Sequence, residues 1–270
     1  MTNTAPNASA PGAPFFICGT RRPYRTQPLN PLDSLNPLDF VMVYCPLMPR
    51  APFLALTLAI GCVITTFAQA PGVHPISGRV YAQVMGYQGA PWLDREERDI
   101  EEAPDVALDA LGLKAGWTVA DVGAGSGYMT VRMARRVGRT GRVYAEDIQP
   151  QMIELLTKRL AKERITNVTP VLGLVDDPKL PDAALDLVLM VDVYHEFSEP
   201  QKMLRKLRTA IKPGGQLVLL EYRKEDPKVP IRPDHKMSVA EAKLEVEAEG
   251  FTLSRVDKRL PRQHILIFTR

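Results

Sequence analysis

Residues 119–128 read Val-Ala-Asp-Val-Gly-Ala-Gly-Ser-Gly-Tyr, and this stretch decides the fold class. An apolar run followed by Gly123, Gly125 and Gly127 predicts a strand, a sharp turn and then a helix. Glycines at such a turn also let a ligand approach the backbone closely. The dinucleotide fingerprint G-x-G-x-x-G would need glycine where the chain has Tyr128, and a phosphate-binding P-loop would need a Lys-Ser/Thr pair that is missing here.

Outside this loop, short apolar runs alternate with amphipathic segments. Strands separated by helices of this length predict a parallel sheet covered on both faces, and two closing strands predict an antiparallel pair at one edge. We therefore expect an α/β, Rossmann-like doubly wound fold whose mostly parallel seven-stranded sheet has an antiparallel edge strand. The predicted strands are 118–122, 142–145, 168–172, 185–191, 216–220, 251–256 and 264–268. The predicted helices are 100–113, 128–137, 150–162, 200–211 and 238–248, with a helix stop and tight turn at 212–215.

The first 70 residues differ in composition from the rest. Residues 1–47 are rich in proline and lack a periodic apolar pattern, which predicts disorder, and a start at Met48 would leave them untranslated. A basic residue, an uncharged run over 51–68 and a closing Ala-Gln-Ala follow the order of a secretory signal peptide. Residues 48–70 are thus predicted to be a signal peptide or an uncleaved membrane anchor.

The remaining chain divides into an N-terminal extension or lid, residues 71–104, and one main domain, residues 105–270. The signal-like segment predicts an exported, periplasmic or membrane-attached protein, with a cytoplasmic protein as the alternative. Any attachment to a membrane would be through that segment alone. The sequence carries no prediction of oligomeric state.

Charge and cysteine content exclude several function classes. Removing the four arginines and two aspartates of the first 70 residues from totals of 34 and 31 leaves 30 basic and 29 acidic residues. This balance lacks the basic excess of a nucleic-acid binder. Cys18, Cys45 and Cys62 all precede residue 71, so the main domain has no thiolate metal site, and its few histidines are widely spaced. We therefore predict no metal centre.

The second predicted strand ends in two carboxylates about twenty residues beyond the glycine loop. A carboxylate at this place can bind a ribose diol through two hydrogen bonds. Asp147 is the preferred candidate because it lies just past the apolar run, and Glu146 is the substitute; either could instead only cap the next helix. Asp121 in the first strand is a candidate to orient the loop amides and a ligand's ammonium group.

Four motifs together resemble the class I S-adenosylmethionine-dependent methyltransferases: VADVGAGSGY at 119–128, VYAEDIQPQM at 143–152, LDLVLMVDVYHEF at 185–197 and IKPGGQLVLLEY at 211–222. The resemblance covers about 100 residues directly and implies S-adenosylmethionine as the methyl donor. Leu174 stands where the family often has a polar residue beside the adenine, so Asp176 or Asp177 would have to replace it. The implied cofactor-binding residues are Asp121, Gly123, Ala124, Gly125, Gly127, Glu146, Asp147, Asp176 and Asp192.

The loop after the fourth predicted strand is the candidate for catalysis. In the family this loop flanks both the methyl group and its acceptor, and Tyr194, His195 and Glu196 could orient or deprotonate an acceptor. A structural role for the histidine is the alternative. Glu221 and Tyr222, at the end of the fifth predicted strand, are further candidates for the same role. Residues 234–236 could form part of the rim of the site or only a solvated loop. Trp92 and Arg95 could cover the cleft as a lid, or Trp92 could instead hold the N-terminal extension in place.

The expected function is transfer of a methyl group to a small-molecule acceptor by in-line displacement. The chain lacks the Asn/Asp-Pro-Pro-Tyr loop of amino-group methyltransferases, which argues against adenine or glutamine as the acceptor. Absence of cysteine in the main domain excludes radical chemistry that needs a cysteine-bound iron–sulfur cluster. The alternatives are a non-catalytic module that binds S-adenosylmethionine and an NAD-dependent oxidoreductase, which Tyr128 disfavours.

Overall fold

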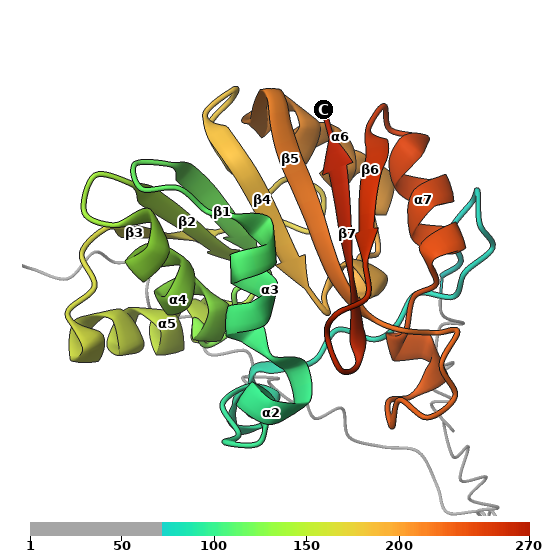
Figure 1. The fold of residues 1–270 in the computed structure, drawn as a ribbon, viewed down its shortest axis with the longest axis horizontal. Helices are drawn as coiled ribbons and strands as arrows, with labels where there is room; N and C mark the ends of the chain where they lie inside the picture. Colours follow the sequence, from blue (N-terminus) through green and yellow to red (C-terminus); the bar gives the residue numbers. More distant parts are fainter. Residues whose placement is uncertain (1–71) are drawn as a thin grey trace, which may run out of the picture. The chain divides into compact units, whose positions relative to one another are not determined.

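The computed structural model describes residues 72–270 (Figure 1). The predicted disordered segment and the predicted signal peptide or anchor lie outside the described residues. Among residues 72–270, no helix is both long enough and apolar enough to cross a membrane.

Seven strands form one sheet in the order β3-β2-β1-β4-β5-β7-β6. The first five run parallel, whereas β7 is antiparallel to both of its neighbours, β5 and β6. The predicted Rossmann-like sheet with its antiparallel pair at one edge is therefore confirmed (Figure 1). The strands are β1 (Thr118–Val122), β2 (Arg142–Asp147), β3 (Val168–Leu172), β4 (Leu185–Val191), β5 (Ile211–Tyr222), β6 (Thr252–Asp257) and β7 (Gln263–Thr269).

Helices cover both faces of the sheet. The apolar sides of α3, α4 and α5 pack on one face, and those of α6 and α7 pack on the other. Figure 1 shows α3 and α4 in front of the sheet and α6 behind it. The helices of the main domain are α3 (Pro104–Leu111), α4 (Tyr128–Val137), α5 (Pro150–Glu163), α6 (Pro200–Ala210) and α7 (Val239–Glu247). The last of these begins with a capping box formed by Ser238 and Glu241.

Two local predictions differ from the structure. The helix predicted over 100–113 is broken at Ala103, whose φ is 49°, because the following Pro104 disfavours helical geometry in the residue before it. It forms α2 (Arg98–Glu102) and α3 instead. The turn predicted at 212–215 is an irregularity inside β5: Leu185 pairs with Ile211, and only two residues later Leu187 pairs with Gln216.

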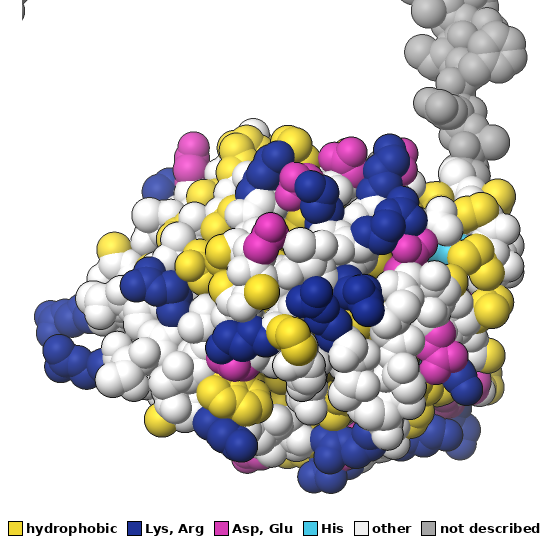
Figure 2. Space-filling model, turned by 90° about the horizontal axis from the view of Figure 1, so that it is seen from above, with side chains coloured by type: hydrophobic (Ala, Val, Ile, Leu, Met, Phe, Trp, Pro, Cys, Tyr) yellow, Lys and Arg dark blue, Asp and Glu magenta, His cyan; other side chains and the backbone are white. Residues whose placement is uncertain are grey.

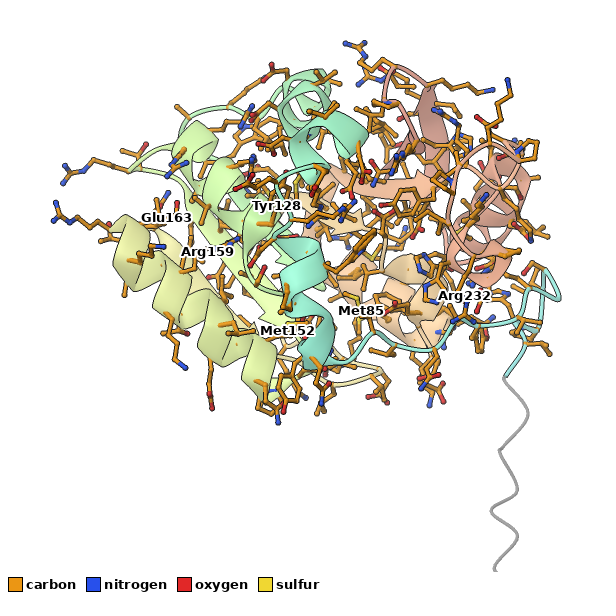
Figure 3. The ribbon with its side chains drawn as sticks, turned by 90° about the horizontal axis from the view of Figure 1, so that it is seen from below. Met85, Tyr128, Met152, Arg159, Glu163 and Arg232 are labelled. Atoms are coloured by element: carbon orange, nitrogen blue, oxygen red, sulfur yellow. The ribbon has the colours of Figure 1, made fainter. Side chains whose placement is uncertain are left out.

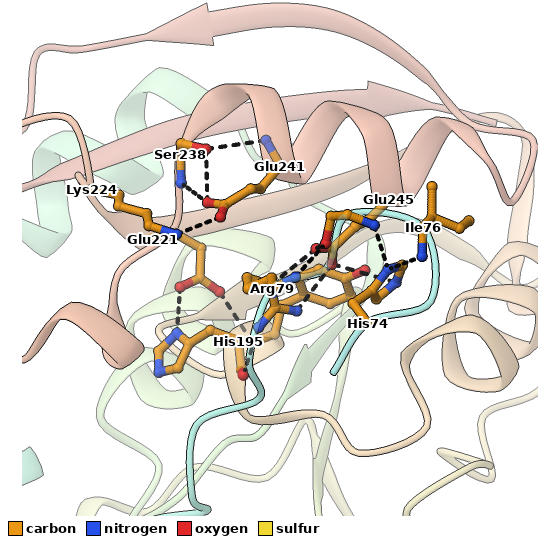
Figure 4. A network of polar contacts seen from close by, with 11 residues as sticks. His74, Ile76, Arg79, His195, Glu221, Lys224, Ser238, Glu241 and Glu245 are labelled. Carbon is orange, nitrogen blue, oxygen red and sulfur yellow. Dashed lines mark hydrogen bonds and ion pairs between the residues drawn. The ribbon is translucent and has the colours of Figure 1, made fainter. Parts of the chain in front are cut away.

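Residues 72–103 form the extension, which contains η1 (Tyr87–Gly89), α1 (Ala90–Leu93) and α2. Its first part is fixed to α7 by a buried bidentate ion pair, in which Arg79 Nε and Nη2 each lie 3.0 Å from a carboxylate oxygen of Glu245 (Figure 4). The extension then runs along the carboxyl ends of the parallel strands, where it contributes residues to two cavities.

The opposite end of the molecule, at the amino ends of those strands, is shown in Figure 2. Lys and Arg side chains are scattered over this face between hydrophobic and acidic ones. This mixed surface agrees with the near balance of charge in the sequence.

Candidate active site

The glycine loop lies against the end of β2. The backbone N–H of Gly125 donates to Asp147 Oδ2 at 2.9 Å. A Cβ added at Gly123 would lie 2.4 Å from Val193 Cγ2, and one added at Gly125 would lie 2.7 Å from Leu93 Cδ1. Side chains at these two positions would fill the space that the loop encloses, so the loop forms a cradle for a ligand.

This cradle is one wall of the first cavity, which lies beyond the carboxyl ends of β1, β2 and β4 as expected for ligands of parallel sheets. The extension supplies its cover. Its lining residues include Val84, Met85, Leu93, Gly123, Gly125, Glu146, Asp147, Met152, Val175, Asp192 and Glu196.

Two neighbouring carboxyl groups at the end of β2 enter the first cavity. Asp147 uses its second oxygen to accept from the backbone N–H of Gln149 at 2.8 Å, and burial raises its pKa. Burial and the neighbouring Asp147 raise the pKa of Glu146 to about 8, and its Oε1 has no hydrogen-bond partner among the described residues. Glu146 is therefore largely neutral at pH 7 and can pair with a polar ligand atom.

Several predicted cofactor residues build the loop without lining the cavity. Asp121 accepts from Thr130 Oγ1 at 2.6 Å and so ties β1 to α4, and burial raises its pKa to about 6. The backbone N–H of Ala124 donates to the Glu146 carbonyl at 2.8 Å. Gly127 lies against Leu156 of α5. These three positions hold the loop's shape, because their contacts are with protein rather than with the cavity.

The predicted adenine contact Asp176 lies elsewhere. Leu174 and Asp177 form an isolated antiparallel bridge, and the tight turn between them carries Asp176 away from the first cavity. Asp176 lines a shallow hollow beside α6 instead, and Val175 takes its place at the first cavity. The structure therefore does not bring Asp176 together with the other predicted cofactor residues, because of a turn that could not be located from the sequence.

Asp192 follows β4 in a left-handed conformation with φ of 52°, which is uncommon for a residue with a side chain. Its Oδ2 accepts from Gln263 Nε2 at 2.5 Å, while Oδ1 has no partner among residues 72–270. Burial, together with the nearby Glu102 and Glu221, raises its pKa well above the usual range. Asp192 lines both the first cavity and the second one described next.

The second cavity adjoins the first and has a volume of about 490 Å³. The two share Val84, Met85, Leu93, Val191, Asp192 and Glu196. In Figure 3, which looks at this edge from below, Met152 of α5, Met85 of the extension and Arg232 before α7 lie across it in that order. The residues that line only the second cavity include Trp92, Arg95, Arg98, Glu102, His195, Tyr222, Arg232 and His235.

Of the three predicted catalytic residues, Tyr194 does not reach either cavity. The residues form a short 3-10 turn, η2 (Tyr194–Glu196), which points Tyr194 into the core and its two neighbours toward the cavity. The tyrosine ring is fully buried and packs edge-to-face on Phe197 at 5.6 Å between centroids. The structure therefore does not bring Tyr194 together with His195 and Glu196 at the cavity, because its ring lies in the core.

A line of polar contacts runs through His195. Its Nδ1 lies 2.6 Å from Glu221 Oε2, and its Nε2 lies 3.2 Å from His235 Nδ1. The other oxygen of Glu221 accepts from the backbone N–H of Tyr194 at 3.1 Å (Figure 4). Burial alone would lower the pKa of His195, but the Glu221 carboxylate outweighs it and the net pKa is raised.

A second polar group also lines the second cavity. Glu102 accepts from Arg98 Nε at 2.6 Å, from Arg95 Nη2 at 2.8 Å and from the Tyr222 hydroxyl at 2.9 Å. Sequence reasoning named Arg95 and Tyr222 but missed Arg98 and Glu102, because nothing in the pattern of α2 marks them. The sequence had offered two interpretations of residues 234–236, a part of the rim or a solvated loop. In the structure His235 of this loop lines the second cavity.

Comparison with known proteins decides the family. Residues 119–215 match the family described as "Methyltransferase domain". A structure titled as an S-adenosylmethionine-dependent methyltransferase from Aquifex aeolicus superposes with a TM-score of 0.65 and 29% identity, over 69% of this chain and 98% of that chain. Residues 119–215 thus form a methyltransferase domain, and the chain resembles the class I S-adenosylmethionine-dependent methyltransferases.

Curated relatives within this methyltransferase family match part of the chain. The ubiquinone/menaquinone biosynthesis C-methyltransferase UbiE of Hydrogenovibrio crunogenus is 34% identical over 119 residues, which is 44% of this chain and 47% of that protein. The corresponding Escherichia fergusonii protein is 31% identical over 118 residues. The chain thus spans about half the length of the curated relatives it matches.

The family and the Aquifex aeolicus structure indicate S-adenosylmethionine as the methyl donor. The first cavity has the features that such a ligand needs: a loop without side chains at Gly123 and Gly125, and the unpartnered buried oxygens of Glu146 and Asp192. A buried polar atom without a partner is unfavourable, so ligand groups that satisfy these oxygens gain binding energy.

Proposed function

We propose that the protein transfers a methyl group from S-adenosylmethionine, bound in the first cavity, to a small-molecule acceptor bound in the second. The observation that carries this proposal is the wall of six residues that the two cavities share. In-line displacement requires the acceptor atom, the methyl carbon and the sulfur to lie on one line, and two adjoining cavities supply such a path.

On the cofactor side, Asp147 would bind the ribose and Glu146 a polar group of the adenosine half. Both lie at the end of β2, beside the glycine cradle. Asp192, at the shared wall, would lie beside the sulfonium. When bound, the cofactor supplies a methyl group that is already activated, so these residues need only hold and align it.

On the acceptor side, the size and cover of the second cavity favour a small molecule. A volume of about 490 Å³ falls within the range of cavities that hold small ligands. The extension covers this cavity with Val84, Met85 and Trp92, which leaves less room for a segment of a polymer. His195 and Glu196 line it on one side and are the groups best placed to orient the reacting atom.

The test is a transfer assay with the full chain, methyl-labelled S-adenosylmethionine and fractionated small-molecule extracts. We expect label in a small-molecule fraction, and micromolar binding of the cofactor, or about 8 kcal/mol, by calorimetry. Cofactor binding without label transfer to any fraction would instead support a non-catalytic binding module. Binding of NAD without binding of S-adenosylmethionine would support an oxidoreductase.

A further inference from the structure

We propose that His195, Glu196 and His235 form a binding site for one divalent transition-metal ion in the wall of the second cavity. One ligand atom from each lies within 4.8 Å of the others. His195 Nε2 and His235 Nδ1 are 3.2 Å apart, and Glu196 Oε1 lies 3.7 Å from the second nitrogen and 4.0 Å from the first.

These separations are close to those of a metal site. Ligand atoms about 2.1 Å from an ion, at angles between octahedral and tetrahedral, are about 3.0–3.4 Å from one another. The two nitrogens already have this spacing, and the carboxylate oxygen must move inward by about half an ångström. Glu196 is the last residue of the short turn η2 and can make this movement by side-chain rotation.

The donor set indicates which ion would bind. Two imidazole nitrogens and one carboxylate oxygen suit Zn²⁺, Fe²⁺ or Co²⁺, whereas Mg²⁺ and Ca²⁺ prefer oxygen donors. Three protein ligands leave at least one position open. Because all three residues line the second cavity, an open position would be accessible to an oxygen or nitrogen atom of the acceptor.

The proposed ligands His195 and Glu196 also form hydrogen bonds with surrounding residues, as metal ligands usually do. Glu221 binds Nδ1 of His195 and so leaves Nε2 of that ring for the metal. The His195 carbonyl accepts from Arg79 Nη1 at 2.9 Å, and the Glu196 carboxylate accepts from the backbone N–H of Met85 at 3.3 Å. These contacts place the ligands in position before any ion binds, which reduces the entropy lost on binding.

Folding brings this group together from residues that are far apart in the sequence, so the proposal departs from the expectation of no metal centre. His235 is 40 residues from His195 and belongs to η3 (Pro233–His235). Within residues 72–270 no other set of three His, Cys, Asp or Glu side chains converges in this way. His264, for example, contacts only one carboxylate, that of Glu225 at 2.9 Å.

The test is a titration of the metal-free full chain with Zn²⁺ and with Co²⁺, followed by calorimetry and by the visible absorption of bound Co²⁺. Cys18, Cys45 and Cys62 are replaced by serine in every sample, because thiolates outside the proposed site would compete for the metal. We expect one ion per chain with micromolar or tighter affinity. His235→Gln and Glu196→Gln should each weaken binding about 100-fold.

The matched control is His264→Gln, which removes a histidine of the same chain outside the proposed site and should leave metal affinity unchanged. Melting curves and circular dichroism spectra establish that each variant is folded. Failure to bind either metal, or variants that bind as the parent does, would overturn the proposal. The titration contains no methyl donor or acceptor, so its outcome is independent of the proposed methyl transfer.

Discussion

The sheet and the extension are held in place by different forces. The sheet buries apolar side chains against helices on both of its faces. The extension has little regular structure and is attached through polar contacts, such as the pair of Arg79 and Glu245, which are 166 residues apart in the chain. Apolar periodicity can be read from neighbouring residues, whereas a long-range polar contact exists only once the fold has formed.

The cavities lie where these two regions meet. The main domain supplies the glycine loop, Asp147 and Asp192, and the extension supplies Val84, Met85 and Leu93. Substitutions that break the polar contacts of the extension should therefore affect the site by loosening this segment. Substitutions at the carboxyl edge of the sheet should affect the contacts with the ligand directly. Four predictions test this difference, from the largest expected effect to the smallest.

Arg79→Ala should lower the free energy of unfolding by about 3–5 kcal/mol, because it leaves the buried Glu245 without its bidentate arginine partner. Urea unfolding measures the loss. The matched control is the double variant Arg79→Met with Glu245→Leu, which removes both charges and should recover most of the stability. A loss below about 1 kcal/mol for Arg79→Ala would mean that the polar attachment contributes little.

Asp147→Ala should weaken S-adenosylmethionine binding by about 1.5–3 kcal/mol, the scale of lost hydrogen bonds to a charged group. Calorimetry at constant pH measures the change. Glu146→Ala is the comparison and should have the smaller effect, because that group is largely neutral at pH 7. A reversal of the two effects would assign the ribose contact to Glu146.

Glu146 should also make stability depend on pH. Its pKa rises from an ordinary value of 4.5 to about 8 on folding, so between these values the folded chain keeps a proton that the unfolded chain has released. Raising the pH through this window should lower the free energy of unfolding by up to about 1.4 kcal/mol per pH unit, with no further loss above pH 8.

The control for that pH dependence is Glu146→Gln, which keeps the shape and removes the proton. Unfolding is measured for both proteins between about pH 5 and about pH 9. The difference between the two curves isolates Glu146 from other buried carboxyl groups. Parallel curves would show that burial does not shift the pKa of Glu146.

Gln149→Ala should loosen the extension without disturbing the sheet. The Gln149 side chain accepts from the backbone N–H of Tyr87 at 2.8 Å and donates to the carbonyl of Met85 at 3.0 Å. Loss of these bonds should destabilise the attached segment by about 1 kcal/mol and speed its amide hydrogen exchange about fivefold. Equal acceleration in β1 and β4 would contradict independent attachment of the two regions.

The sequence predicted those parts of the structure that depend on local pattern. The helix over 128–137 and the strands over 118–122 and 185–191 have the predicted bounds, because their apolar residues recur with a regular period. Asp147, His195 and Glu196 line the cavities, because strand ends in a parallel sheet converge. Their roles in binding and catalysis remain predictions.

The parts that could not be predicted depend on where a loop turns. A 3-10 turn decides that Tyr194 enters the core while His195 enters the cavity, and an isolated bridge decides that Asp176 points away. Glu102 acquires its distant partner, the Tyr222 hydroxyl, only when α2 meets the end of β5. Side-chain direction in irregular segments depends on such tertiary contacts, which carry no periodic signal.

The position of the extension over both cavities also bears on the rate of turnover. Val84, Met85 and Leu93 line each cavity, and Leu93 reaches the glycine loop itself. Under the proposed function, spent cofactor and methylated product would leave past this segment, and fresh cofactor would enter by the same route, so movement of the segment would assist both steps. If the chemical step is faster than that movement, the opening frequency of residues 84–93 sets how many molecules the enzyme processes each second.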